Sequence, residues 1–197
     1  MKKWVSLLLV ILILTGCTAV RIDTKDIDNI VDVVLSKDNK LYNHIGKGYK
    51  YYIPRGMTYI DTNEFNDKIY SGGIYYYLYI DAISYYHQKE TKYEKHQKSI
   101  YFKEINANDK KGYIDIIEED GKYLVEFMYN YARIESLVNK EDINDVILNS
   151  SYILSTVKFN NNVIKILLDE DYFKYKEEKF ELFEKEEKKE NFLEYTE

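Results

Sequence analysis

Glu119-Asp120-Gly121-Lys122 is the strongest hairpin signal in the chain, and it predicts that the core of the protein is an antiparallel sheet. Asp-Gly suits a two-residue type I′ turn, whose positive φ values match the right-handed twist of the strands that it joins. Strand-like sequence lies on both sides of this turn, over 113–118 and 123–132. In the second segment, aromatic residues and one valine at the odd positions alternate with a mixture of apolar and polar residues at the even positions. We therefore expect two antiparallel strands here, with one face turned toward a core.

Further strands are predicted on both sides of this hairpin. Turn residues separate segments that are rich in Tyr, Ile and Val, which is typical of short strands. The segments are 49–53 and 57–61 around Pro54-Arg55-Gly56, 74–86 after Ser71-Gly72-Gly73, 99–105, and 156–159 and 163–168 around Asn160-Asn161-Asn162. The stretch 74–86 shows no helix-capping pattern, so we expect one long strand there. The polar residues 87–97 are expected to form a loop.

Two amphipathic helices are expected to cover this sheet. Apolar residues recur with helical spacing over 27–35, and Asp23 or Thr24 can cap the start of that helix. A second apolar stripe runs over 143–154, and Asn139 can cap the helix that carries it. The order of elements predicts an α+β fold, in which an antiparallel sheet is covered on one face by two amphipathic helices.

The predicted domain, residues 24–168, is followed by a segment of different composition. Residues 169–197 hold six lysines and twelve acidic residues, with four aromatic residues at helical spacing. They are predicted to form a charged, acidic tail that is helical or frayed, and that is either a solvated end or a partner-binding helix. The whole chain has a formal net charge of −6. It lacks the basic stripe that nucleic-acid binding needs, so we expect no nucleic-acid partner.

Residues 1–16 have the pattern of a signal peptide. Met1-Lys2-Lys3 is a short cationic start, and an apolar run follows up to Leu14. This run is too short for a membrane-spanning helix, which needs about 20 apolar residues. Leu14-Thr15-Gly16-Cys17 comes next and contains the only cysteine of the chain. It resembles the lipobox of bacterial lipoproteins, which implies that Cys17 is lipidated and becomes the first residue of the mature chain.

The lipobox resemblance also implies a location. The mature chain would be held at the extracytoplasmic side of a bacterial cell membrane by a lipid anchor on Cys17, with residues 17–23 as a short tether. An uncleaved transmembrane anchor is the alternative, and the shortness of the apolar run disfavours it. A lipidated Cys17 leaves no cysteine for a disulfide, so we expect the stability of the domain to come from its core.

Two short stretches of the domain are similar to parts of a known fold. The first is Tyr49-Lys50-Tyr51-Tyr52-Ile53 running into Pro54-Arg55-Gly56-Met57, and the second is Ile153-Leu154-Ser155-Thr156-Val157-Lys158-Phe159. Together they resemble the Mog1/PsbP-like α+β sandwich, whose members often begin with a strand ending in Pro-x-Gly and finish with a helix and a short strand. The resemblance implies a binding or assembly module without catalytic residues.

The sequence contains little that points to catalysis. His44, His87 and His96 lack the spacing of a metal site and are expected at the surface. The chain has no nucleophile elbow, phosphate loop or dinucleotide fingerprint. We therefore expect no enzyme, no cofactor and no metal ion. The alternative is an envelope enzyme, or an accessory subunit of an envelope enzyme or transporter.

Tyrosines in the predicted strand 74–86 are the candidate binding surface. Tyr75, Tyr77, Tyr79 and Tyr85 alternate with other aromatic and apolar residues, so rings are expected on both faces. One face must pack on the helices, and the other can present rings to a sugar or a protein. The plainer explanation is the strand propensity of Tyr in a Tyr-rich chain. The sequence thus predicts a non-catalytic binding module whose partner is an envelope protein or a glycan.

Overall fold

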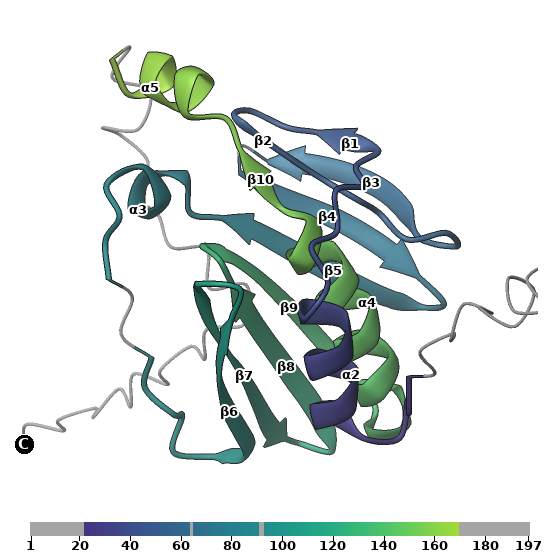
Figure 1. Ribbon diagram of the computed structural model, residues 1–197. Helices are drawn as coiled ribbons and strands as arrows, with labels where there is room; N and C mark the ends of the chain where they lie inside the picture. The colour runs from purple at the N-terminus through teal and green to yellow at the C-terminus, as the bar shows by residue number, and fades with distance from the viewer. Residues whose placement is uncertain (1–21, 64, 91–92, 170–197) are drawn as a thin grey trace, which may run out of the picture.

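The computed structural model describes residues 22–63, 65–90 and 93–169 of the chain (Figure 1). Three predicted features lie outside these residues: the signal peptide, Cys17, and the tail from residue 170 onward. Within the described residues, the fold is α+β, with one large antiparallel sheet of seven strands and a smaller sheet of three strands. The predicted fold class is therefore confirmed.

More of the described residues lie in strands than in helices. The strands are β1 (His44–Ile45), β2 (Tyr49–Tyr51), β3 (Thr58–Asn63), β4 (Asn66–Ser71), β5 (Ile74–Ile80), β6 (Ser99–Ala107), β7 (Lys110–Glu119), β8 (Lys122–Tyr129), β9 (Ala132–Val138) and β10 (Lys158–Phe159). The helices are α2 (Ile27–Leu35), α3 (Ala82–Tyr86), α4 (Ile143–Thr156) and α5 (Asn161–Asp169), with a single 3₁₀ turn at Lys140–Asp142 before α4. The strand order is β3-β4-β5-β9-β8-β7-β6 in the large sheet and β1-β2-β10 in the small one.

Two-residue turns with positive φ set the register of the large sheet. The turn pairs are Gly72-Gly73, Asn108-Asp109, Asp120-Gly121 and Asn130-Tyr131, with φ between 51° and 91°. Positive φ at both central residues defines a type I′ turn, which matches the twist of the flanking strands. The hairpin predicted at Asp120-Gly121 is confirmed by the pairing of β7 with β8.

The predicted strand 123–132 is wrong in its last part. Asn130 and Tyr131 form a turn, and the chain then returns as β9, for which no strand was predicted. An aromatic residue rarely adopts the φ of +61° that Tyr131 has, so the sequence gives no clear turn signal here. β4 was also not predicted.

The predicted long strand 74–86 is wrong beyond Ile80. Asp81 accepts a hydrogen bond from the backbone N–H of Ser84 at 2.8 Å and caps the short helix α3. The predicted strand 163–168 is likewise the helix α5. The side chain of Asn160, expected in a turn, accepts hydrogen bonds from the backbone N–H groups of Asn162 and Val163 at its start.

The predicted helix caps also differ from those in the structure. The side chain that caps α2 is Asp26, which accepts a hydrogen bond from the N–H of Asp28 at 2.9 Å, and not Asp23 or Thr24. Asn139 precedes the 3₁₀ turn but makes no capping hydrogen bond there with its side chain. The two predicted helices themselves are present as α2 and α4, so the errors concern only their first residues.

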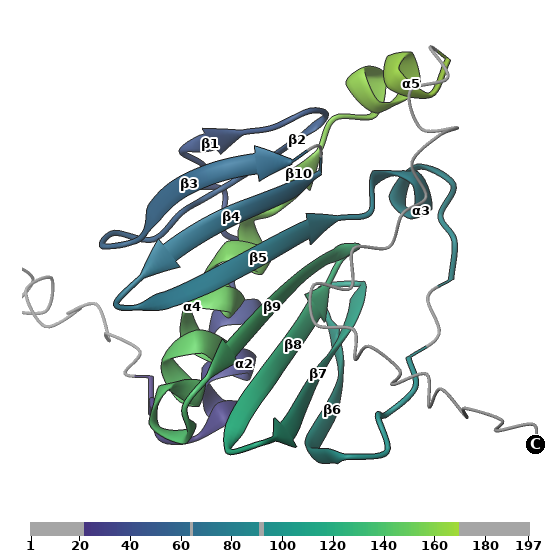
Figure 2. The same cartoon turned by 180° about the vertical axis from the view of Figure 1, so that it is seen from behind.

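The described elements form two layers. Helices α2 and α4 lie on one face of the large sheet, and the small sheet lies beside them over β3 and β4 (Figure 1). The opposite face of the large sheet, here called the outer face, is turned to the viewer in Figure 2. The core between the layers includes Ile30, Leu78, Ile114, Phe127 and Ile147, none of which is exposed. None of the described helices is long and apolar enough to span a membrane.

Both edge strands of the large sheet are irregular. The register shifts at Ile60 in β3 and at Ile100 in β6, where each strand carries a bulge. Both isoleucines are about half exposed, at 48% and 55%. A bulge bends a strand and interrupts its ladder of backbone hydrogen bonds.

Candidate functional site

Three of the four candidate tyrosines share the outer face of β5. Side chains on the inner face of this strand, such as Tyr76 and Leu78, are buried under the helices. On the outer face, Tyr75 is 43% exposed, and Tyr77 and Tyr79 are half-buried. The period of two in the strand therefore places these three rings together, as the sequence predicted. We call Tyr75, Tyr77 and Tyr79 the tyrosine row.

A lysine from the neighbouring strand lies over two rings of the tyrosine row. The Nζ atom of Lys68 is 4.3 Å from the ring centre of Tyr75 and 5.5 Å from that of Tyr77. The ring of Tyr70 lies 5.1 Å from that of Tyr75 on the side of β4. A cation over an aromatic face is held by the electrostatic field of the ring. One end of the row thus combines exposed aromatic surface with a positive charge.

The other end of the row meets a charged cluster. The Cζ atom of Arg133 lies 5.7 Å from the ring centre of Tyr79. Its guanidinium nitrogens lie 3.0 Å from Glu135 and 3.5 Å from Glu126, which face each other across β8 and β9. Two facing carboxylates repel each other, and the guanidinium offsets this repulsion. The hydroxyl of Tyr113 donates a hydrogen bond to Glu126. Burial and the charge of Glu126 raise the pKa of Tyr113 above its ordinary value.

Tyr85 does not belong to the tyrosine row. It lies on α3, beyond the point where β5 ends. Its ring stacks on that of Phe159 with centres 3.8 Å apart, and it meets the ring of Tyr131 edge-on at 5.8 Å. The sequence grouped Tyr85 with the other three because a long strand was expected there.

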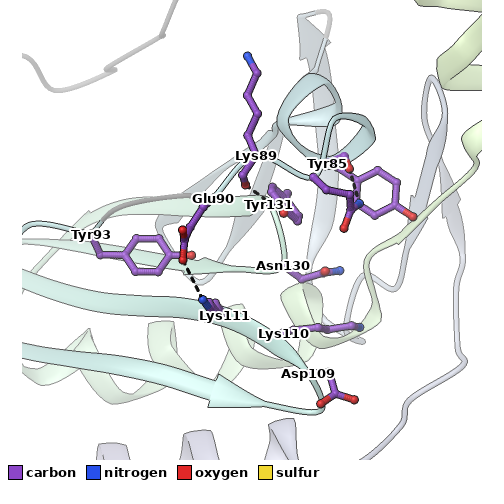
Figure 3. A pocket seen from close by; sticks show the side chains of 10 residues that line it. Tyr85, Lys89, Glu90, Tyr93, Asp109, Lys110, Lys111, Asn130 and Tyr131 are labelled. Atoms are coloured by element: carbon purple, nitrogen blue, oxygen red, sulfur yellow. Dashed lines mark hydrogen bonds and ion pairs between the residues drawn. The ribbon is translucent and has the colours of Figure 1, made fainter.

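Tyr85 instead lines a pocket at one end of the large sheet (Figure 3). The pocket has a volume of about 320 Å³ and lies between the segment after α3, the β6–β7 turn and the β8–β9 turn. It is lined by Tyr85, Gln88, Lys89, Glu90, Tyr93, Asp109, Lys110, Lys111, Asn130 and Tyr131. Lys111 and Glu90 form an ion pair at 3.2 Å, and the hydroxyl of Tyr131 donates to the carbonyl of Lys89 at 3.1 Å. These contacts join the segment after α3 to the two turns.

A polar cluster lies between the two sheets. Asp67 on β4 is 1% exposed, and one of its oxygens accepts hydrogen bonds from the hydroxyls of Tyr49 at 3.0 Å and Tyr51 at 2.8 Å. Burial, together with the charge of Asp67, raises the pKa of both tyrosines far above the ordinary value. They therefore stay protonated at neutral pH and act as hydrogen-bond donors. This cluster was not predicted from the sequence, because its members come from two different sheets.

The histidines occupy two kinds of environment. Nε2 of His44 lies 3.7 Å from Asp67, and its ring stacks on Tyr59 with centres 4.4 Å apart. The side chain of His44 is 19% exposed, so it lies only partly at the surface. His87 and His96 are exposed, as predicted. Among the described residues, no group of three or more His, Cys, Asp or Glu side chains is placed to hold a metal ion.

Comparisons with known proteins add no assignment to these sites. No protein-family model, curated protein or solved structure matches the chain. The lipobox and the Mog1/PsbP-like resemblance therefore stay predictions from the sequence. The geometry of the outer face and of the pocket carries the functional argument.

Proposed function

We propose that this chain is a lipid-anchored, non-catalytic binding module on the extracytoplasmic face of a bacterial membrane, and that it binds a polypeptide of the cell envelope on the tyrosine row. The observation that carries this proposal is the position of Tyr75 and Lys68. An aromatic ring that is 43% exposed lies beside an ammonium group on a surface of packed strands. Aromatic residues beside a cation are typical anchors of protein interfaces.

The packing around Tyr75 favours a polypeptide over a glycan. A sugar ring needs an open aromatic face on which to stack, whereas Lys68 lies over both Tyr75 and Tyr77 and Tyr70 lies against Tyr75. The ammonium of Lys68 is a hydrogen-bond donor without acceptor capacity. A polypeptide segment with carboxylate side chains supplies the matching acceptors.

The start of the domain supports a short distance between the domain and the membrane. The backbone carbonyl of Thr24 accepts a hydrogen bond from the side chain of Asn144 at 2.9 Å, which fixes the chain to the beginning of α4. Only residues 18–23 then separate this point from Cys17. A lipid on Cys17 would hold the described domain close to the bilayer surface.

Photo-crosslinking in intact cells tests this function. Thr58, Tyr70 and Tyr75 lie side by side in the register of β3, β4 and β5, so Thr58 is on the same face and is exposed. Benzoylphenylalanine at Thr58 should crosslink one polypeptide, identified by mass spectrometry as an extracytoplasmic protein. Lys68→Glu replaces the ammonium group over Tyr75 and Tyr77 by a carboxylate, so it should abolish this adduct.

A second crosslinking position provides the control. Ile166 on α5 is 56% exposed and lies away from β3 and β4, so benzoylphenylalanine there should not give the same adduct. The same adduct from both positions, an adduct that survives Lys68→Glu, or an adduct that contains only glycan would contradict the proposal.

A further inference from the structure

A groove with positively charged side chains lies between the small sheet and the start of α5. It has a volume of about 600 Å³, and its lining comes from parts of 42–50, from 158–163 and from Leu167. The lining includes Lys47, Lys50 and Lys158, and none of the described lining residues is an aspartate or a glutamate. We call this hollow the basic groove. It is a positively charged site on a chain whose formal net charge is −6.

Strand register places two of these lysines side by side. Lys50 on β2 pairs directly with Ile45 on β1 and with Lys158 on β10, so the three side chains form a row on one face of the small sheet. The Cβ atoms of such partners lie about 5 Å apart, and like charges at these positions repel each other. Among the described residues, neither Lys50 nor Lys158 has a carboxylate within ion-pair distance. Acidic groups bound in the groove would offset this repulsion.

Exposed apolar surface borders the two lysines. Ile45, at one end of the row, is 71% exposed, and Tyr42 and Val163 are also exposed walls of the groove. The ammonium of Lys50 lies 3.9 Å from the ring centre of Tyr42, and an aromatic face holds a cation without neutralising it. The groove thus combines apolar surface with positive charge. It suits a polypeptide segment that has both apolar and acidic side chains.

The two walls of the groove are held together where α5 begins (Figure 1). The N–H of Asn160 donates to the carbonyl of Gly48, in the β1–β2 turn, at 2.8 Å. Gly48 has a φ of +81°, and a Cβ atom at this position would lie 2.8 Å from Cγ1 of Ile164. This close approach requires glycine and fixes α5 against the turn. The groove is therefore already formed in the described fold.

We propose that the acidic segment 177–187 of this chain binds in the basic groove. The segment contains six glutamates and two lysines, which give it a formal charge of −4, together with Phe180, Leu182 and Phe183. Its glutamates complement the row of Lys50 and Lys158, and its apolar side chains match the apolar walls beside that row.

The chain between α5 and this segment is long enough for the contact. The nine residues of α5 have a length of roughly 13 Å, and the groove lies at the beginning of this helix. Residues 170–176 can span roughly 23 Å when extended, so the segment can return to the groove. A segment linked by so few residues is present at an effective concentration of roughly millimolar, which favours it over a separate partner. The tyrosine row lies on the opposite face of the large sheet and stays open.

Photo-crosslinking of the purified full-length chain in detergent tests this contact. Benzoylphenylalanine at Ile45 should crosslink to residues 177–187, identified by mass spectrometry after digestion. Chains labelled with heavy nitrogen are mixed with unlabelled chains, because a crosslink within one chain never joins a labelled peptide to an unlabelled one. The positional control is Ile100 on β6, which is 55% exposed and lies at the edge of the large sheet opposite β3. Benzoylphenylalanine there should give no crosslink to 177–187.

Charge reversal tests the ionic part of the contact. Lys50→Glu combined with Lys158→Glu should lower the yield of the crosslink by about fivefold or more. Glu181→Lys combined with Glu184→Lys should have the same effect. All four substitutions together should restore the crosslink, because opposite charges then face each other again. Lys140→Glu is the matched control, because Lys140 is exposed and precedes α4, whereas Lys158 follows its end. It should leave the yield within about twofold.

The variants in 177–187 change no residue that lines the groove, so their result holds even where a groove variant fails to fold. The proposal is overturned by any of four results: no crosslink to 177–187, crosslinks only between labelled and unlabelled chains, equal crosslinks from Ile45 and Ile100, or an unchanged yield after charge reversal in 177–187. The purified chain has no envelope partner present. These results are therefore independent of the crosslink at Thr58, and either proposal can fail alone.

Discussion

Asp67 shows how one buried carboxylate joins the two sheets. Its side chain comes from the large sheet, and the two hydroxyls that donate to it come from β2 in the small sheet. Its other oxygen has no hydrogen-bond partner among the described residues. Loss of one donor would therefore leave a buried carboxylate still less satisfied, which is costly.

We predict that Tyr51→Phe lowers the free energy of unfolding by about 1.5 to 3 kcal/mol, the range for a hydrogen bond to a charged group. Urea unfolding of the full-length chain measures this. Tyr52→Phe is the matched control, because Tyr52 is the adjacent residue and its hydroxyl has no hydrogen-bond partner in the described part of the chain. Equal losses in the two variants would show that the hydrogen bond to Asp67 contributes nothing.

At the scale of elements, two carboxylates of α2, Asp28 and Asp32, contact β6, and Asp28 makes the closer contacts. Asp28 accepts hydrogen bonds from Lys103 and from the hydroxyl of Tyr101, both at 2.8 Å. The hydrogen bond from Lys103, followed by that from Tyr101, holds the pKa of Asp28 below its ordinary 3.8. Lys103 also lies 3.2 Å from Asp32, one turn further along α2.

Asp28→Asn should destabilise the chain by less than about 1 kcal/mol at neutral pH, because the carboxylate is largely exposed and the interaction is screened. The folded-state pKa of Asp28 is lowered, so its contribution is full above pH 3.8 and is lost as the pH falls through the lowered value. Urea midpoints at neutral and strongly acidic pH should therefore differ between variant and native chain only at neutral pH. A difference that persists in acid would contradict this linkage.

Elements defined by local signals were predictable from the sequence. Asp120-Gly121 and the helical periodicity of α2 and α4 depend on short-range chemistry, and each is present in the structure. The turn at Asn130-Tyr131 depends on distant groups instead. The carbonyl of Tyr131 accepts from the N–H of Asp81 at 2.9 Å, and its hydroxyl donates to Lys89. Contacts between residues so far apart in the chain cannot be recognised from the sequence around the turn.

The two candidate sites also differ in whether the sequence predicted them. A period of two was enough to place Tyr75, Tyr77 and Tyr79 on one face. The pocket at the end of the large sheet was not predictable, because its lining comes from three parts of the chain: the segment after α3, the β6–β7 turn and the β8–β9 turn. Sequence periodicity does not show which distant segments of the chain lie side by side in the folded domain.

For the whole molecule, the start of the described chain and the pocket lie at opposite ends of the domain (Figure 1). Thr24 lies beside the start of α4, and the pocket lies beside α3 and the β8–β9 turn. A lipid on Cys17 would thus present the pocket and the β6–β7 turn to the outside. This arrangement depends on the processing of the first residues, which can be measured directly.

We predict that the membrane-bound form begins at an acylated Cys17 and lacks Trp4, the only tryptophan of the chain. Intact-mass measurement of the protein extracted from membranes checks this, since lipid and leader give different masses. Cys17→Ser should abolish both processing and membrane retention. A membrane form that retains Trp4 would exclude the lipobox interpretation.

If the chain is held at a membrane surface, as proposed, the bulges at Ile60 and Ile100 affect how neighbouring copies can meet. Confinement to two dimensions raises the local concentration and brings neighbouring copies together in similar orientations. Regular exposed edge strands would then invite polymerisation from sheet to sheet. The irregularity at each edge of the large sheet interrupts the backbone ladder where a second copy would pair. The two bulges therefore disfavour pairing of neighbouring copies from edge to edge.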